Sequence, residues 1–331
     1  MAKFKRNDPC HCGSGKKFKK CHFLKSTAVR LPVFQMTNEF AGAKTAIDFF
    51  EPPDVYCDTN IWRSMTATQL NRLLELRTVV PLRYWFSIVN YIELISHLGS
   101  TEFHRVRSWF HRVRTLCNGN ILPSPEWEFM ASIGMDKYIH SCWIVNGHSL
   151  AARIQNIAMA SSLDEIPDWK TEVAHYQQLR AIDEKSFSDA ITRIRAKVGD
   201  GRDNIKASLD HVSNWFLGCL APFFLLTRPS QGKLRLKLLS KSEQDRFCQA
   251  FLEGTGQLFH AHCTAVLTTT FKDGKKLDLN HLNDMLLLLQ ATSNRIFVTN
   301  EKLFLRYSTM DPQAARAMSL AELLEAQRAA G

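Results

Sequence analysis

Asp58 is the first candidate for chemistry in this sequence. It follows a short β-prone segment, residues 54–57, and begins the run Asp58-Thr59-Asn60, after which the pattern becomes helical. The carboxylate is therefore predicted at the carboxyl end of a strand, where ligands bind in α/β sheets. A structural alternative is that Asp58 or Thr59 caps the following helix. This run by itself leaves both roles open.

A similar arrangement recurs near the C-terminus. Residues 295–298, Arg-Ile-Phe-Val, predict a compact strand that ends in Thr299-Asn300-Glu301. Fifteen residues before Thr299, Asp284 lies near the start of a predicted helix and precedes a methionine and four leucines, so this carboxylate enters an apolar environment. Helix caps and a buried ion pair are the structural alternatives for these acids.

A fourth acid lies on a helix predicted over residues 85–98. The sides of this helix are largely apolar, but Asn90, Glu93 and His97 share one stripe. A buried glutamate costs free energy unless it is paired or bound to a metal. Glu93 alone could hold a structural salt bridge or take part in chemistry. Four acids, two at strand ends and two on helices, favour a role in chemistry over separate structural roles.

Further elements must bring these four acids together. Strands are also predicted near 78–81 and 120–123, and helices over 101–117 and from residue 124. Residues 131–276 are mostly helical in pattern and poor in motifs. Strands that alternate with helices predict an α/β fold.

The order of the acids resembles that of the PIN domain, a family of Mg²⁺- or Mn²⁺-dependent nucleases. Acids of that family follow the first strand, lie on the helix after the second strand, begin a helix ahead of the fourth strand and end that strand. The residues at these places are Asp58, Glu93, Asp284 and Glu301. Glu301 stands where the family has Asp, which moves the carboxylate out by one methylene.

This resemblance implies a fold and a reaction. The fold would be a three-layer α/β/α domain with a central, mostly parallel sheet, formed by residues 53–130 and 280–331 and interrupted by a large helical insertion at 131–279. The four acids would bind Mg²⁺ or Mn²⁺ and catalyse hydrolysis of RNA phosphodiester bonds. The neighbours that would orient the carboxylates and water are Thr59, Asn60, Thr299 and Asn300.

Three other functions compete with an RNA nuclease. A phosphatase with an aspartyl nucleophile would usually show Asp-x-Asp after its first strand, and Asn60 stands at the second of these positions. A toxin of a toxin–antitoxin pair is a subclass of the nuclease, disfavoured by the length of 331 residues. The main rival is a catalytically inactive PIN-like scaffold that binds a ribosome or a partner protein.

Three thiols and an imidazole near the N-terminus predict a structural zinc site. The ligands are Cys10, Cys12, Cys21 and His22. Residues 5–22 closely resemble the SEC-C motif, a zinc-binding tail known from the SecA translocation ATPase. His11 stands where that motif usually has Pro and could compete as a ligand, and Phe23 stands where it has Gly. The resemblance implies a docking module for proteins or ribosomes at residues 1–25, followed by a linker at 26–52 with a short helix near 38–50.

Positive charge concentrates in the same module. Residues 1–30 contain nine Lys and Arg and one Asp, which gives +8 of the total +10 and leaves +2 for the rest. Such a patch favours polyanions such as nucleic acid. A second basic feature is the helix predicted over 101–117, where a solvated face is the alternative to RNA contact. Its arginines are Arg105, Arg107, Arg112 and Arg114.

Composition excludes several classes of protein. The hydrophobic content of 45% suits a globular domain with a sizeable core. The longest apolar runs are well short of the roughly 20 residues that cross a bilayer, and the basic N-terminus does not resemble a secretory signal. Six of the nine cysteines are scattered singly, which is typical of reduced thiols rather than a disulfide framework. We therefore expect a cytoplasmic protein without a membrane partner.

Overall fold

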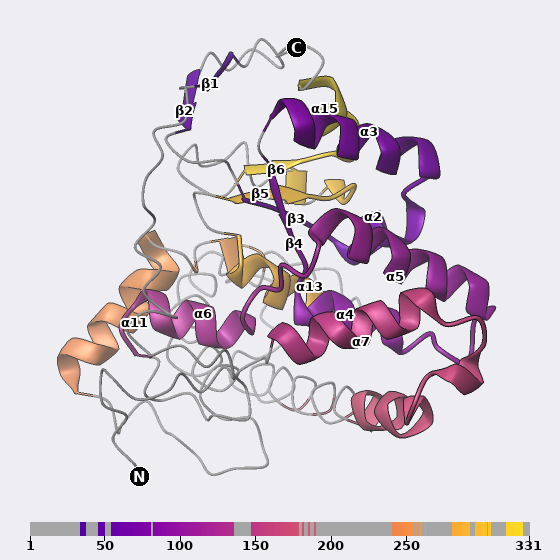
Figure 1. Cartoon of the computed structure of the whole chain (residues 1–331). Coiled ribbons are helices and arrows are strands. Elements are labelled where there is room, and N and C mark those ends of the chain that lie inside the picture. The colour runs from indigo at the N-terminus through magenta and orange to yellow at the C-terminus, as the bar shows by residue number, and fades with distance from the viewer. Residues whose placement is uncertain are drawn as a thin grey trace, which may run out of the picture.

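The computed structural model describes a defined part of the 331-residue chain. The described ranges are 54–80, 82–135, 147–178, 240–253, 280–291, 295–302 and 316–326, together with 34–37, 46–49 and a few single positions between them. The architecture of this part is mixed α/β, mostly helical, around a small parallel sheet (Figure 1). Within the described residues, no helix is both long and apolar enough to cross a membrane.

The central sheet has four parallel strands in the order β4-β3-β5-β6. They are β3 (Asp54–Cys57), β4 (Arg83–Trp85), β5 (Arg295–Val298) and β6 (Arg316–Met318). In the register of β3 with β5, Asp54 faces Arg295 and Cys57 faces Val298. The predicted parallel sheet is therefore confirmed. The strand expected at 120–123 is reduced to a single parallel bridge between Phe86 and Ile121.

A separate antiparallel pair precedes this sheet. It consists of β1 (Phe34–Thr37) and β2 (Ala46–Phe49), with Phe34 opposite Phe49. The short helix predicted over 38–50 is therefore wrong at residues 46–49. Pairing with a second strand overrides the weak local helical pattern, since strand formation depends on cross-strand neighbours more than on intrinsic preference.

The segment after β3 contains two helices and one wrong expectation. These helices are α2 (Thr59–Ser64) and α3 (Ala67–Val79). α3 begins with a capping box in which Thr66 and Gln69 satisfy each other's backbone N–H groups. Thr78 and Val79 continue this helix instead of starting a strand. The helix ends just before Pro81, because the residue preceding a proline is disfavoured in helical conformation, and β4 begins two residues later.

The next helices agree more closely with the sequence pattern. α4 (Ile88–Ile95) is shorter than the predicted 85–98, because the Ser87 hydroxyl accepts a hydrogen bond from Val89 N and caps the helix there. α5 (Phe103–Cys117) lies within its predicted range and ends at Asn118 in the left-handed conformation, with φ of 48°. α6 (Pro125–Ser132) begins after Ser124, whose hydroxyl accepts from Trp127 N.

The remaining described elements are mostly helical. They are α7 (Gly147–Met159), the short 3₁₀ helix η4 (Leu163–Glu165), a helix over residues 169–178, α11 (Lys241–Glu253), α13 (Asn280–Leu289) and α15 (Leu320–Ala326). Asp284 was expected near the start of its helix. It is the fifth residue of α13 and lies in the second turn.

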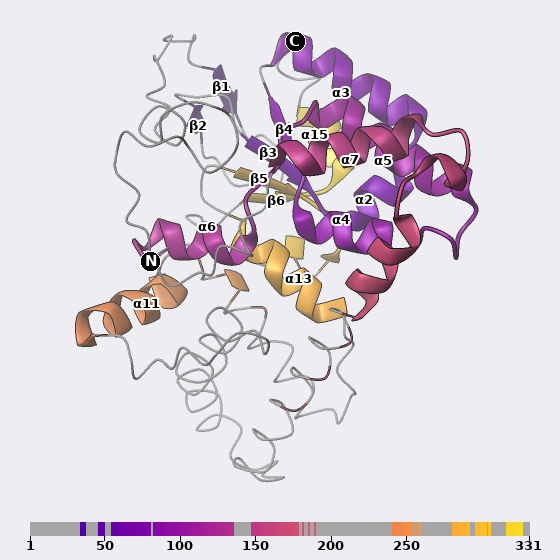
Figure 2. The ribbon, with the colours of Figure 1, turned by 60° about the horizontal axis from the view of Figure 1, so that its bottom comes forward.

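Alternate side chains of the strands point to two apolar layers. Val55, Cys57 and Ile296 join a core to which α2, α3, α5 and α7 contribute. Tyr56 points the other way, where its ring stacks on Phe297 and its hydroxyl donates to the carbonyl of Leu287 on α13. Helices thus lie on both sides of the sheet, α3 and α5 on one and α13 on the other (Figures 1 and 2). α7, from the range predicted as an insertion, packs into the same core as the strands.

Candidate active site

Asp58 and Thr299 lie side by side at the carboxyl ends of two neighbouring strands. Asp58 follows β3, Thr299 follows β5, and both are buried, with 2% and 0% of their surfaces exposed. The Thr299 hydroxyl donates to Asp58 Oδ2 at 3.1 Å, and Asp58 N donates to the Val298 carbonyl at 2.9 Å. The chain leaves β3 for β4 on one side and returns to β5 on the other. This is a topological switch point, the place where open α/β sheets bind ligands.

Glu301 approaches this pair from the loop after β5. Its carboxylate is exposed and its Oε1 accepts a hydrogen bond from Asn60 Nδ2 at 3.3 Å. Glu301 N donates to Thr299 Oγ1 at 3.0 Å. The Thr299 hydroxyl therefore links the loop of Glu301 to the carboxylate of Asp58. Asn300, between them, is exposed.

Glu93 reaches the site from α4 and is held by a residue that sequence reasoning missed. Asn283 on α13 donates from Nδ2 to Glu93 Oε1 at 2.7 Å. Asp284, the predicted acid on this helix, is the next residue and is half-buried. A polar residue beside an acid, ahead of the apolar second half of the helix, was the only sequence signal for Asn283.

Asn90 is a second amide of the site. Its Nδ2 donates to Thr59 Oγ1 at 2.9 Å, and its side chain is completely buried. Its Oδ1 has no hydrogen-bond partner among the described residues. In the sequence pattern Asn90 shares the stripe of Glu93, but the pattern indicates no role for it. A buried carbonyl oxygen without a donor is costly, and a water or a ligand that donates to it would remove this cost.

Burial and the neighbouring acids raise the proton affinity of Asp58. Burial raises the pKa of Asp58 from 3.8 to about 6, and the nearby charges of Glu93 and Glu301 act in the same direction. Hydrogen bonds from the Thr299 side chain and the Asn60 backbone lower this pKa and offset part of the rise. Asp58, Glu93 and Glu301 are therefore close enough to interact electrostatically.

Other acids of the protein are neutralised in a way that these three are not. Asp54 pairs with Arg83 at 2.8 Å, Glu172 with Arg153 at 2.6 Å and Glu128 with Arg295 at 2.5 Å. Asp58, Glu93 and Glu301 instead accept hydrogen bonds from the neutral groups of Thr299, Asn283 and Asn60. In the part of the chain that the structure describes, no Lys or Arg pairs with these three carboxylates, so their negative charge is uncompensated.

This cluster is not a closed metal cage. Among the described residues, no three His, Cys, Asp or Glu side chains converge closely enough to hold a metal ion. The donor chemistry still suits a hard cation, because the carboxylate oxygens of Asp58 and Glu93 and the free Oδ1 of Asn90 are the ligand type that Mg²⁺ prefers.

The comparisons with known proteins concern the other end of the chain. Residues 6–24 match the SEC-C motif. No curated protein and no solved structure matches the chain at a significant level. The predicted resemblance of the N-terminal segment to this motif is therefore confirmed.

The SEC-C motif is often a zinc-binding module, and it contains all four predicted ligands. Cys10, Cys12, Cys21 and His22, and the competing His11, lie within the matched residues. All of them are outside the described part of the structure. Zinc coordination by the SEC-C motif stays a prediction from residue type and spacing.

The predicted RNA-contacting arginines of α5 have different surroundings. Arg112 Nη1 donates to the carbonyls of Trp62 and Arg63 at 2.6 and 3.1 Å, at the C-terminal end of α2. Partial burial lowers the pKa of Arg112. Arg107 Nε similarly donates to the Ala158 carbonyl near the end of α7 at 3.3 Å. These two side chains satisfy carbonyls at helix ends, whereas Arg105 is exposed.

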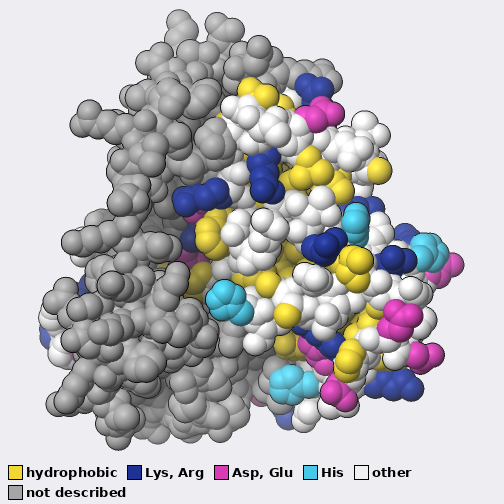
Figure 3. Space-filling view, in the orientation of Figure 1, with side chains coloured by type: hydrophobic (Ala, Val, Ile, Leu, Met, Phe, Trp, Pro, Cys, Tyr) yellow, Lys and Arg dark blue, Asp and Glu magenta, His cyan; other side chains and the backbone are white. Residues whose placement is uncertain are grey.

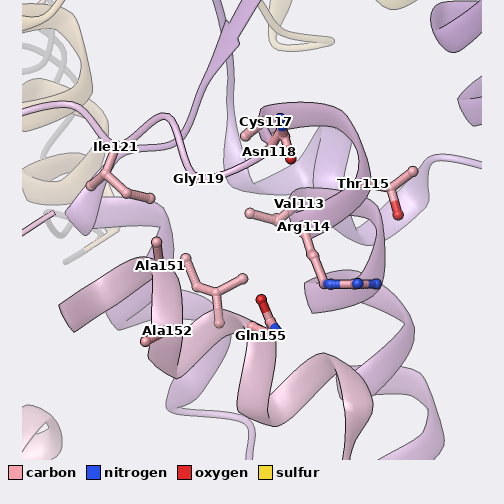
Figure 4. Close-up of a pocket in the computed structure, with 11 residues that line it drawn as sticks. Val113, Arg114, Thr115, Cys117, Asn118, Gly119, Ile121, Ala151, Ala152 and Gln155 are labelled. Atoms are coloured by element: carbon pink, nitrogen blue, oxygen red, sulfur yellow. The ribbon is translucent and has the colours of Figure 1, made fainter. Parts of the chain in front are cut away.

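Arg114 lies at a separate groove between α5 and α7, with a volume of about 570 Å³. Figure 4 shows Arg114, Thr115 and Gln155 at this groove, with Ala151 and Ala152 on the α7 side. None of its lining residues is acidic. The groove is therefore distinct in composition from the acidic cluster of Asp58, Glu93 and Glu301.

Proposed function

We propose that this chain is a PIN-like, metal-dependent endoribonuclease that hydrolyses RNA phosphodiester bonds at the acidic cluster. One observation carries the proposal. The buried Asp58 carboxylate lies at the switch point of a parallel sheet, next to Glu93 and Glu301, and none of the three has a cationic partner among the described residues. A protein tolerates such a charge cluster when a bound cation compensates it.

The positions of the acids in the fold support this proposal. Asp58 follows β3, Glu93 lies on the helix after β4, and Asp284 lies on α13, the helix ahead of β5. Glu301 follows β5 after Thr299 and Asn300. The PIN-like interpretation expects acids after the first strand, on the helix after the second strand, on a helix ahead of the fourth strand and at the end of that strand.

Asp58 and Glu93 are the residues that would hold Mg²⁺ or Mn²⁺, and in this proposal Asp284 and Glu301 would complete the acidic set. A closed set of three protein ligands is not required, since Mg²⁺ is usually held by one or two carboxylates and keeps several waters. Such a cation supplies activation of the attacking water and charge compensation at the phosphate. Neutral groups of the chain would orient the carboxylates that hold this cation. Thr299 and Asn283 each occupy one carboxylate oxygen through a neutral donor, so the ligands are oriented without losing their charge.

The SEC-C motif would act beside the catalytic domain. With zinc bound to Cys10, Cys12, Cys21 and His22, this small basic module would fold and dock the enzyme to RNA, a ribosome or a partner protein. Residues 1–30 carry +8, nine basic residues against one acid, which suits a polyanionic partner.

An inactive binding scaffold is the second candidate, favoured by one observation. No three acidic, His or Cys side chains converge on a metal position within the described residues. In this alternative, the acids are a relic of a nuclease site and the SEC-C motif carries the function.

Cleavage of a mixed pool of single-stranded RNAs in the presence of Mn²⁺ distinguishes the two candidates. The nuclease requires metal-dependent cleavage that Asp58→Asn abolishes. The matched control is Asp54→Asn, which alters the opposite end of the same strand, where Asp54 pairs with Arg83. It should cleave like the wild type at temperatures where both are folded. Absence of cleavage by the wild type, or cleavage by Asp58→Asn at the wild-type rate, would leave the scaffold as the better description.

A further inference from the structure

Arg63 is an exposed cation next to the acidic cluster that the sequence did not single out. It lies in the last turn of α2. Asn60 stands three residues earlier on the same exposed face of this helix and donates to Glu301. Residues three apart on a helix are neighbours, with about 5–6 Å between their Cβ atoms. Arg63 is therefore one helical turn from a residue that touches the acidic site.

The surroundings of Arg63 hold its guanidinium in place. Its Cζ lies 5.4 Å from the centre of the Trp109 ring on α5, within the range of cation–π attraction. Arg112 donates to the Arg63 carbonyl and already satisfies the end of α2, so the Arg63 side chain is not needed for that purpose. A cation that is ordered before binding loses less conformational entropy when it meets an anion.

Two further arginines lie around the same tryptophan. Arg105 and Arg112 stand four residues before and three residues after Trp109 on α5, so the three side chains share one stripe. In the described part of the chain, no carboxylate pairs with Arg63, Arg105 or Arg112. Figure 3 shows Lys, Arg and His side chains among polar and apolar ones across the middle of one face of the molecule.

α2 thus separates two groups of charges of opposite sign that have no ion-pair partner among the described residues. Asp58, Glu93 and Glu301 gather at its beginning, and Arg63 and Arg112 lie at its end. Six helical residues span about 9 Å at about 1.5 Å per residue. A ligand that fits both ends must carry several negative charges spaced along a chain, because one charge would be attracted to the arginines while a cation bridges another to the acids.

We propose that Arg63, with Arg105, binds the backbone phosphates of a single-stranded nucleic acid next to the phosphate at the acidic cluster. This inference rests on the proposed function and adds to it a path for the substrate, from the carboxyl ends of β3 and β5 along the exposed face of α2. Contact with phosphate carries no base information. The surface therefore sets the position of the strand rather than its sequence.

Binding can be tested apart from cleavage. The probe is a fluorescent 12-residue oligouridylate, measured by anisotropy in EDTA over a series of salt concentrations, with full-length protein that carries Asp58→Asn. Loss of one phosphate contact reduces the log–log salt slope by about 0.7 for a single strand. Arg63→Gln should therefore weaken binding about fivefold at 0.1 M salt and flatten the slope by about 0.7. The double variant Arg63→Gln with Arg105→Gln should flatten the slope by about 1.4.

Two further variants separate phosphate binding from folding. Arg63→Lys keeps the charge and should keep the wild-type slope. Arg77→Gln is the matched control, since Arg77, like Arg63, stands in the last turn of a helix. Arg77 belongs to α3 and donates to the carbonyl of Leu116 on α5. Its slope should not change.

An unchanged slope in Arg63→Gln, no binding of the oligonucleotide, or equal displacement of it by poly-glutamate would overturn the proposal. Cleavage is scored separately, in protein with Asp58 intact. An Arg63-dependent slope without cleavage would remove the nuclease and leave the nucleic-acid surface.

Discussion

The Thr299 hydroxyl donates to the Asp58 carboxylate across 241 residues of sequence, and both side chains are buried. This contact ties the end of β5 to the end of β3. Because Thr299 is neutral, it orients Asp58 without cancelling its charge. Asp54, by contrast, is paired with the cation of Arg83, which neutralises its charge. The contrast between these two kinds of acid leads to the predictions that follow.

Asp58→Asn should stabilise the protein at neutral pH. The pKa of Asp58 in the folded protein, about 6, lies above the value of about 3.9 in an unfolded chain. The folded state therefore binds this proton more tightly. The stabilising contribution is complete below pH ~4 and is lost as the pH rises to ~6. Urea unfolding should show Asp58→Asn equal to wild type near pH 4 and more stable near pH 7.5, by up to about 3 kcal/mol at 1.4 kcal/mol per pKa unit.

Mn²⁺ should raise the thermal midpoint of the wild type in a concentration-dependent way. A ligand at one hundred times its dissociation constant adds about 2.7 kcal/mol to the stability. Asp58→Asn should lose most of this gain, whereas Asp54→Asn should keep it because Asp54 is already paired with Arg83. Differential scanning fluorimetry measures all three proteins. A flat response of the wild type up to millimolar Mn²⁺ would contradict a metal site at the acidic cluster.

Asn283→Asp should make the protein more dependent on a divalent cation. The new carboxylate would stand where Asn283 now donates to Glu93 at 2.7 Å, so two like charges would repel each other. At pH 8, its melting temperature should be lower than that of Asn283→Ala without metal and should rise further than the wild type's when Mn²⁺ is added. An equal response of both variants would mean that Glu93 and Asn283 do not form part of the metal site.

Arg112→Gln should destabilise the protein by about 1–3 kcal/mol, because a charged donor is removed from two carbonyls at the end of α2. Arg105 is exposed on α5, the helix that also carries Arg112. Arg105→Gln should therefore change the stability by no more than about 0.5 kcal/mol. Chemical denaturation compares the two. Similar losses in both would show that Arg112 has no special role in closing α2.

Removal of zinc from the SEC-C motif should affect only the N-terminal module. Replacing Cys12 and Cys21 by Ser removes two thiolate ligands, and the protein should then contain about one zinc fewer per chain, measured by atomic emission. The melting temperature of the rest should stay as it is, because the module would fold on its own ion. Equal zinc content in the wild type and the variant would rule out these cysteines as ligands.

Local signals in the sequence were sufficient for several features. The strand at residues 295–298 lies within its predicted bounds because three consecutive strand-forming residues, Ile-Phe-Val, are followed by polar ones. α5 follows from its apolar period, and the SEC-C motif follows from ligand type and spacing. Asp58 and Glu93 were singled out because an acid at a strand end or on a buried helix face needs an explanation. All of these depend on residues close together in the chain.

Long-range packing decided the rest. Local preference favoured a strand at 78–81, but α3, which is capped by Thr66, continues to Val79. Arg112 belongs to a basic stripe in the sequence, but packing of α5 against α2 directs it to the carbonyls of Trp62 and Arg63. The contact of Asn283 with Glu93 joins residues 190 positions apart. The sequence by itself determined the strands at 54–57 and 295–298, the helix α5 and which residue types could do chemistry. Only the tertiary structure decided which side chains meet, because that depends on the order of the strands and the packing of the helices between them.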